Sequence, residues 1–143
     1  MKVRPHKKSC EKFKKALKEA TRRNRGQSLE SFKKRLKEIV QGWVGYFRNS
    51  SMKTFVDDIS RWLRRRIRQI HWKQWKRTRT KFSALVKLGI SREKAWEWVS
   101  TRKSYWRIAG SWVLATTLTN KFLWSKGWVT PDRVYRKLSG SDW

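Results

Sequence analysis

The sequence predicts an all-α fold, and three observations support this prediction. Apolar residues recur at steps of three and four along most of the chain, which is the period of an amphipathic helix. Ser, Gly and Pro stand at the ends of these periodic stretches, where helix caps and stops are expected. No run with the two-residue period of a strand is longer than a few residues. We therefore expect helices joined by short turns, without an internal repeat.

The first two expected helices form the N-terminal third of the chain. Ser9 can cap a helix over about residues 10–22, and Ser28 can cap a second. The second carries an apolar stripe made of Phe32, Leu36, Ile39, Val40, Trp43 and Phe47. Gly42 and Gly45 fall near its end, where each costs about 1 kcal/mol relative to Ala. Close approach of another backbone would explain them, and fraying of the helix is the alternative.

Residues 54–77 are expected to form one long third helix with two opposed stripes. One stripe is apolar and is expected to pack into the core, and its members are Val56, Ile59, Leu63, Ile67 and Ile70. The other is expected to face outward, and its members are Arg61, Arg65, Arg68, Trp72 and Trp75.

The C-terminal half is expected to hold four shorter helices. One spans about residues 80–88 and stops at Gly89, and Ser91 caps the next. An apolar helix follows near residues 112–125, and a short one starts around Pro131. The basic stretch at residues 78–82 is the expected seam between two subdomains.

The charge of the chain predicts a polyanionic partner. Lys and Arg number 38 against 10 Asp and Glu, so the formal net charge of the 143 residues is +28. Such an excess favours nucleic acid or an anionic membrane surface. Eleven Trp and six Phe argue against disorder, since disordered chains are poor in aromatic residues. A membrane would need the apolar stripes to be free, whereas the other helices can cover them.

Residues 61–77 place eight Lys or Arg and three Trp among seventeen positions without an acidic residue. Cations neutralise phosphates, and rings beside them can stack on unpaired bases. Because duplex DNA hides its base faces, this combination favours structured RNA or an RNA–DNA hybrid. The alternative for Trp62, Trp72 and Trp75 is that they are core residues.

No catalytic or metal-binding pattern stands out. Asp57 and Asp58 imitate the aromatic-x-Asp-Asp sequence of reverse-transcriptase active sites, but they fall in the first turns of an expected helix. There, acidic residues favourably meet the helix dipole. His6 and His71 have no carboxylate or thiol at ligand spacing. We expect no metal, no cofactor and no enzymatic activity of the chain by itself.

Five motifs occur in an order and spacing that resemble a known family. They are GWVGYFRNS, TFVDDISRWLRRRIRQIHWKQWKR, LGISREKAWEW, TRKSYWRIAGS and LTNKFLWSKGWV. Together they resemble the C-terminal part of group II intron-encoded reverse transcriptase/maturases over about residues 4–138. The resemblance implies a thumb-like helical bundle over residues 1–78 and a maturase-specific subdomain, called domain X, over residues 79–143. It also implies that the fingers–palm domain with the polymerase carboxylates is absent.

The resemblance implies roles for particular residues. Gly42, Trp43, Tyr46 and Phe47 match the thumb motif and are expected to be structural. Ser104 stands where the family motif, commonly written R-K-G-Y-W-R, has Gly, so the turn there is in question if that Gly needs a positive φ. The expected RNA contacts are Arg61, Arg64, Arg65, Arg68, Trp72, Lys73, Trp75, Lys76, Arg77, Arg79, Lys81, Arg102, Lys103, Tyr105, Trp106 and Arg107.

These observations predict an RNA-binding, non-catalytic module that binds group II intron RNA and promotes its folding and splicing. One alternative is an interaction subunit of a split reverse transcriptase, which would grip template–primer duplex together with a separate polymerase polypeptide. Another is a general nucleic-acid-binding protein. A single cysteine and the lack of a signal peptide or transmembrane segment favour the cytoplasm of a bacterial-type cell.

Overall fold

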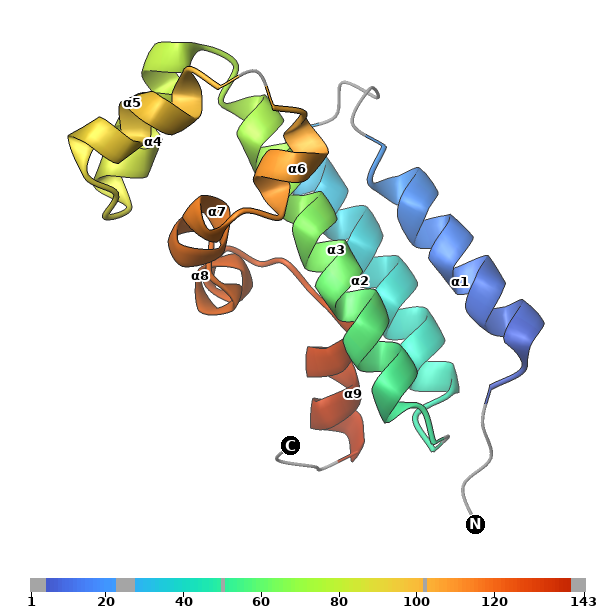
Figure 1. Ribbon diagram of the computed structural model, residues 1–143. Coiled ribbons are helices and arrows are strands. Elements are labelled where there is room, and N and C mark those ends of the chain that lie inside the picture. The colour runs from blue at the N-terminus through green and yellow to red at the C-terminus, as the bar shows by residue number, and fades with distance from the viewer. Residues whose placement is uncertain (1–4, 23–27, 50, 102, 140–143) are drawn as a thin grey trace. The chain divides into compact units, whose positions relative to one another are not determined.

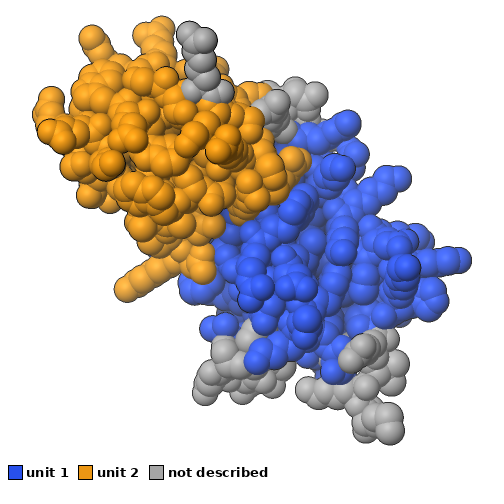
Figure 2. Space-filling model, viewed as in Figure 1, with its two compact units in different colours: residues 1–64, 124–143 blue, residues 65–123 orange. Residues whose placement is uncertain are grey.

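The computed structural model describes residues 5–22, 28–49, 51–101 and 103–139, and these form nine helices without a strand (Figure 1). The all-α prediction is therefore confirmed. The chain divides into two compact units, which Figure 2 shows in different colours. Unit 1 comprises residues 1–64 and 124–143, and unit 2 comprises residues 65–123.

Unit 1 is a helical bundle. It contains α1 (Lys7–Ala20), α2 (Leu29–Tyr46), the first half of α3 (Lys53–Gln74) and α9 (Pro131–Ser139). The long helix α2 packs against both α1 and α9. The buried apolar residues include Phe13, Leu17, Phe32, Leu36, Val40, Val44, Val56, Leu63 and Trp128. They recur at helical spacing, so the bundle follows directly from the amphipathic pattern.

The caps of unit 1 agree with the sequence in one helix and differ in another. Ser28 Oγ accepts a hydrogen bond from the backbone N–H of Ser31 at 3.2 Å, as predicted. The first helix begins earlier than predicted, because His6 Nδ1 accepts from the N–H of Lys8 and caps it in place of Ser9.

Gly42 and Gly45 do not mark a close approach of another backbone. A Cβ added at either glycine would have no atom within 4 Å, apart from its chain neighbours and its own helix backbone. That expectation is wrong, and so is the fraying alternative, because α2 continues through both glycines to Tyr46. Next to them, the Trp43 ring stacks on Phe13 with centroids 4.4 Å apart.

Unit 2 contains the second half of α3 and several short helices. These are α4 (Thr78–Lys87), α5 (Arg92–Val99), α6 (Tyr105–Ala109), α7 (Trp112–Thr117) and the first turn of α8 (Asn120–Ser125). α4 and α5 pack on each other across a turn at Gly89, whose φ of 107° needs glycine. Ser91 Oγ then accepts from the N–H of Lys94 and caps α5, as predicted.

The apolar helix expected at residues 112–125 is two helices. Leu118 ends α7 with φ −97° and ψ 65°, outside the helical region. Thr119 Oγ1 accepts from the N–H of Phe122 at 3.1 Å, which starts α8. The break turns the carbonyl of Leu118 into an acceptor for the side chain of Arg68.

The long helix α3 confirms the prediction of a buried apolar stripe. Val56, Ile59, Leu63, Ile67 and Ile70 are each at most 5% exposed. Helix α3 contributes its first turns to unit 1 and its later turns to unit 2. The two units are defined by how the helices pack. The predicted division at residues 78–79 separates thumb-like and maturase-specific regions, and it stays a prediction.

Candidate nucleic-acid interface

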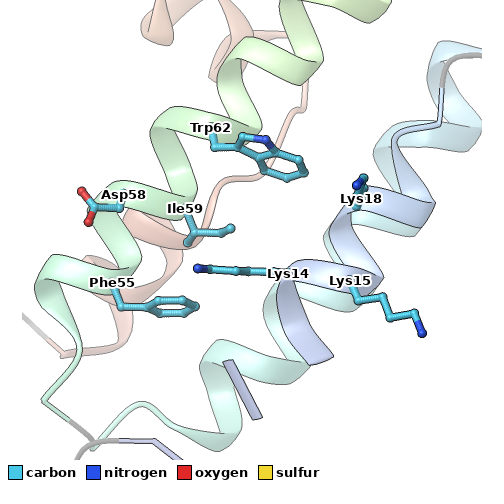
Figure 3. A pocket seen from close by; sticks show the side chains of 7 residues that line it. All are labelled: Lys14, Lys15, Lys18, Phe55, Asp58, Ile59 and Trp62. Atoms are coloured by element: carbon cyan, nitrogen blue, oxygen red, sulfur yellow. The ribbon is translucent and has the colours of Figure 1, made fainter. Parts of the chain in front are cut away.

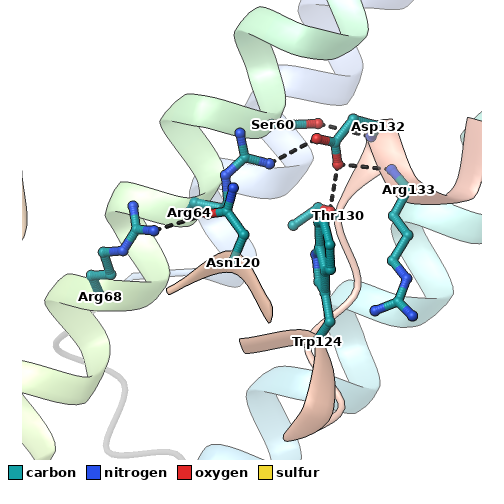
Figure 4. Close-up of polar contacts among 8 residues, drawn as sticks. All are labelled: Ser60, Arg64, Arg68, Asn120, Trp124, Thr130, Asp132 and Arg133. Carbon is teal, nitrogen blue, oxygen red and sulfur yellow. Dashed lines mark hydrogen bonds and ion pairs between the residues drawn. The ribbon is translucent and has the colours of Figure 1, made fainter. Parts of the chain in front are cut away.

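The basic residues of α3 do not form one outward stripe. Arg61 is exposed, and its guanidinium lies 3.5 Å from the carboxylate of Asp58. Arg64 is only 9% exposed and donates a 2.8 Å hydrogen bond to Asp132 Oδ2 (Figure 4). As an isolated buried charge would be strongly unfavourable, this contact makes Arg64 a structural residue. RNA contact by Arg64 stays a prediction, but its guanidinium is already paired inside unit 1.

Asp132 is the centre of a buried polar network in unit 1. Its Oδ1 accepts from the hydroxyl of Thr130 at 2.6 Å and from the N–H of Arg133 at 2.7 Å, and its own N–H donates to Ser60 Oγ. Burial by itself would raise the pKa of Asp132, but the hydrogen bonds from Thr130 and Arg64, with the charge of Arg64, hold this pKa below its ordinary value. The carboxylate is therefore kept ionised against Arg64.

Arg65 in unit 2 is bound to the segment around α6. Its guanidinium lies 4.0 Å from the centroid of the Trp106 ring and donates two hydrogen bonds, of 3.1 and 2.9 Å, to the Trp106 carbonyl. Gly110 makes room for this arrangement, because a Cβ there would lie 2.7 Å from Cζ of Arg65. The sequence pattern did not identify Gly110 as important.

Arg68 has partners of the same kind. Its Nε donates to the carbonyl of Leu118 at 2.8 Å, and its Nη2 donates to Asn120 Oδ1 at 3.0 Å. Arg65 and Arg68 are half-buried. The outward stripe predicted for Arg61, Arg65 and Arg68 is thus corrected, since two of its three arginines fasten helices of unit 2 together.

The two tryptophans predicted beside these charges differ in exposure. Trp72 is 2% exposed and belongs to the core, so the expectation of an outward ring is wrong for this residue. The Trp72 and Trp75 rings lie 6.2 Å apart between centroids, in an edge-to-face arrangement. Trp75 itself is half-buried.

Lys81 joins two stretches that the sequence analysis had singled out separately. Its ammonium lies 4.8 Å from the centroid of Trp72 on α3 and 5.1 Å from that of Tyr105 on α6. Burial lowers the pKa of Lys81 from its ordinary value. The end of α3, the start of α4 and the segment at residues 103–107 therefore meet in unit 2.

The other predicted contacts lie close in sequence to the residues that meet at Lys81. Tyr105, Trp106 and Lys73 are half-buried. The exposed cations are Lys76, Arg77, Arg79, Lys103 and Arg107. Arg102 lies outside the described residues. Because α3 ends at Gln74 and α4 begins at Thr78, three of these cations fall on or beside the turn between the two helices.

The conformation of Ser104 shows whether the turn at this position needs glycine. Its φ is −62°, and its Oγ accepts from the N–H of Arg107 at 3.3 Å, so it is the N-cap of α6. A positive φ is not required here. The departure from the family motif therefore supplies a cap instead of straining the backbone.

Two tryptophans near this region, one exposed and one half-buried, were not predicted as site residues. Trp112 is 53% exposed and lies edge-on to Trp98, with ring centroids 6.2 Å apart. The ammonium of Lys103 lies 4.7 Å from the Trp98 ring. The signal available in the sequence was the excess of Trp alone, which does not show which rings stay accessible.

Other kinds of site find little support in the described part of the chain. Asp57 and Asp58 lie early in α3, on a helix and not on a hairpin, as predicted. In residues 5–22, 28–49, 51–101 and 103–139, no three His, Cys, Asp or Glu side chains gather as a metal site would require. No described helix has the length and apolar character to cross a membrane.

Comparison with known proteins places part of the chain in a family. Residues 10–89 match the family described as Group II intron, maturase-specific domain. This match covers more than half of the 143 residues and runs across the predicted boundary at 78–79. No curated protein matches the chain. The maturase-specific domain is not the catalytic palm of a reverse transcriptase, and its role is related to group II intron maturation. The chain belongs to the group II intron maturase-specific domain family.

Proposed function

We propose that this chain binds group II intron RNA and promotes the fold that is competent for splicing, without a catalytic step of its own. The observation that carries the proposal is the convergence in unit 2. There, Lys81 contacts rings of α3 and α6, and exposed cations flank both rings in the chain. Within this proposal, residues 1–78 act as a thumb-like bundle and residues 79–143 as the domain X-like part.

The physical basis is electrostatic. Each phosphate that a Lys or Arg neutralises releases condensed counterions, which gives affinity without dependence on base sequence. The exposed cations Lys76, Arg77, Arg79, Lys103 and Arg107 are the primary contacts in this proposal. The half-buried rings of Trp75 and Tyr105 add edges or faces for stacking on unpaired bases.

The structural arginines have an indirect role in this proposal. Arg65 and Arg68 hold α6 and the α7–α8 turn against α3. Arg64 holds α9 against α3 through its hydrogen bond to Asp132. We propose that they position the exposed cations, and that RNA contact by Arg65 or Arg68 is secondary.

A salt titration with intron RNA tests the proposal. If six to ten phosphates are neutralised, the affinity should fall roughly 10³- to 10⁵-fold between 50 and 200 mM salt. Intron RNA should also bind more tightly than unrelated duplex RNA, or an RNA–DNA duplex, at 150 mM salt. Equal affinity for all of them would favour a general nucleic-acid-binding protein. A flat salt response would overturn the electrostatic mechanism.

The alternative of a split reverse transcriptase has its own test. Affinity purification of the tagged chain from cells should recover RNA that sequencing identifies as intron. Stoichiometric recovery of a fingers–palm polypeptide, with template–primer duplex preferred over intron RNA, would support the interaction subunit instead.

A further inference from the structure

Unit 1 contains a groove between α1 and α3 that lies outside all the contacts proposed above. Its volume is about 570 Å³, which is within the range of ligand pockets. Figure 3 shows Phe55, Ile59 and Trp62 extending from α3 toward α1. Lys14, Lys15 and Lys18 of α1 form the opposite side.

The sequence builds the groove from two helix faces. Phe55, Ile59 and Trp62 are spaced by four and three, so they share one side of α3. Lys14 and Lys18 are spaced by four and stand one above the other on α1. The stripe of α1 that includes Phe13 and Leu17 is buried, and the Phe13 ring lies 6.4 Å from the Phe55 ring between centroids. The groove thus has an aromatic floor and a basic edge.

The rings of the floor are partly accessible. Phe55 and Trp62 are half-buried, whereas Ile59 between them is 5% exposed. The ammonium of Lys14 reaches across the groove and lies 5.7 Å from the centroid of the Phe55 ring (Figure 3). A cation–π contact at an exposed site is weak, so an entering base can displace this ammonium, which then meets a flanking phosphate.

The charge around the groove selects an anionic occupant. Among the described residues, Asp58 is the only carboxylate that lines it, and Asp58 already has Arg61 at 3.5 Å. In Figure 3 its oxygens point away from α1. The lining therefore carries three lysines against one carboxylate, so its net charge is positive. Lys14, Lys15 and Lys18 are all exposed.

We propose that this groove binds an unpaired nucleotide of RNA, with the base against Phe55 and Trp62 and the flanking phosphates at Lys14 and Lys18. The proposal rests on the proposed function, because it names the part of the RNA that unit 1 takes. Aromatic rings in the floor suit a base, and the lysines suit the phosphates on either side. Duplex RNA cannot fill the groove in this way, because its base faces are stacked and paired.

The test compares an unstructured octauridine with a duplex RNA of equal phosphate number. Trp62→Leu keeps an apolar side chain but removes the ring, so affinity for octauridine should fall roughly 5- to 100-fold. Affinity for the duplex should stay within about twofold. Lys14→Ala/Lys18→Ala should likewise weaken octauridine binding more than duplex binding.

Lys34→Ala/Lys37→Ala is the matched control. It removes the same charge from exposed positions of α2 in the same unit. If Lys14→Ala/Lys18→Ala and this control weaken octauridine binding equally, the lysines act only through their charge and the groove proposal fails. Intron RNA binding by the unchanged chain is measured in parallel, and its absence would instead overturn the proposed function.

Photo-crosslinking keeps the proposal testable if Trp62→Leu fails to fold. Octauridine with one 4-thiouridine is irradiated with the unchanged chain, and the crosslinked peptides are mapped. Crosslinks to the peptides that carry Phe55 or Trp62 support the groove, and crosslinks only elsewhere overturn it. Both groove variants could instead bind octauridine as tightly as the unchanged chain and lose an acidic polypeptide that otherwise co-purifies. That result would assign the groove to a protein partner and overturn the proposal.

Discussion

Three arginines of α3 and the lysines of α1 lie in different surroundings although both helices are strongly basic. Arg64, Arg65 and Arg68 each donate to an oxygen of the same unit at 2.8–2.9 Å. The lysines of α1, by contrast, remain exposed, from Lys7 to Lys18. Net charge alone does not separate these two cases.

The chemistry of the two cations accounts for the difference. A guanidinium is planar, weakly hydrated and carries several donors, so it can be partly buried when oxygens are in reach. An ammonium is compact and strongly hydrated and stays at the surface. Consequently α3 presents less charge at the surface than its sequence suggests, whereas the lysines of α1 all lie at the surface. The following predictions test this comparison, beginning with the largest expected effect.

Removing the carboxylate partner of Arg64 should destabilise the chain most. Asp132→Asn leaves a buried guanidinium without its counter-charge, so the free energy of unfolding should fall by about 3–5 kcal/mol. Urea denaturation followed by circular dichroism measures it. Asp58→Asn is the control, since its pair with Arg61 is exposed and should contribute about 0–1 kcal/mol. Equal losses in the two variants would contradict a structural role for Arg64.

Truncating Trp72 should have a comparable effect, because the ring is in the core and not at the surface. Trp72→Ala should lower the free energy of unfolding by about 3–5 kcal/mol. Trp75→Ala should cost less, as Trp75 is half-buried. Thermal melting and RNA affinity are measured together for both variants. Reduced affinity of Trp72→Ala with an unchanged melting temperature would mean that Trp72 stacks on RNA after all.

Gly110→Ala tests whether the Arg65 contact is structural. The new Cβ would lie 2.7 Å from Nε of Arg65 and displace it from the Trp106 carbonyl, so we expect a loss of about 1–3 kcal/mol. In an Arg65→Ala background the same change should have much less effect. Gly42→Ala is the matched control, since it meets no atom and should stabilise α2 by up to about 1 kcal/mol. A loss at Gly110 that persists without Arg65 would show another cause.

The helices could be predicted from the sequence, because their signals are local. Apolar spacing located α2 and α3, and serines at positions 28 and 91 marked two helix starts. The partners of the arginines could not be predicted in this way. Arg64 and Asp132 are separated by 68 positions, and Arg65 and Trp106 by 41. Only tertiary packing brings them together.

The sequence did not predict the break at Leu118, because this break also depends on tertiary packing. Residues 112–125 have the composition of one apolar helix, yet the Leu118 carbonyl leaves the helix pattern and accepts from Arg68. Of the candidate site, the sequence identified both stretches that meet at Lys81. It did not identify which of their members are exposed, because the charge pattern of α3 looks the same whether an arginine is solvated or bound.

The Asp132 network should also make the stability of the chain depend on acid pH. The pKa of Asp132 is lower in the folded chain than its ordinary value of 3.8, so protons bind more readily to the unfolded chain. The stabilisation is therefore complete above the ordinary value and is lost as the pH falls through the folded pKa. Urea denaturation of the unchanged chain and of Asp132→Asn, at pH 6 and then downward, should give curves that converge. A constant difference at all pH values would contradict this.

Removing exposed cations should have the smallest effect on stability, but its effect on RNA binding should depend on where the cations lie. Lys76→Ala/Arg77→Ala/Arg79→Ala removes three charges near the turn between α3 and α4, and each substitution should change stability by no more than about 0.5 kcal/mol. If each cation neutralises one phosphate, the salt dependence of affinity, as log K against log salt, should become shallower by about 2 to 3. Lys34→Ala/Arg35→Ala/Lys37→Ala removes equal charge from exposed positions of α2 and should leave the slope nearly unchanged. Equal slopes for the two triple variants would mean that RNA senses only net charge, and that the meeting of α3, α4 and α6 at Lys81 has no special part in binding.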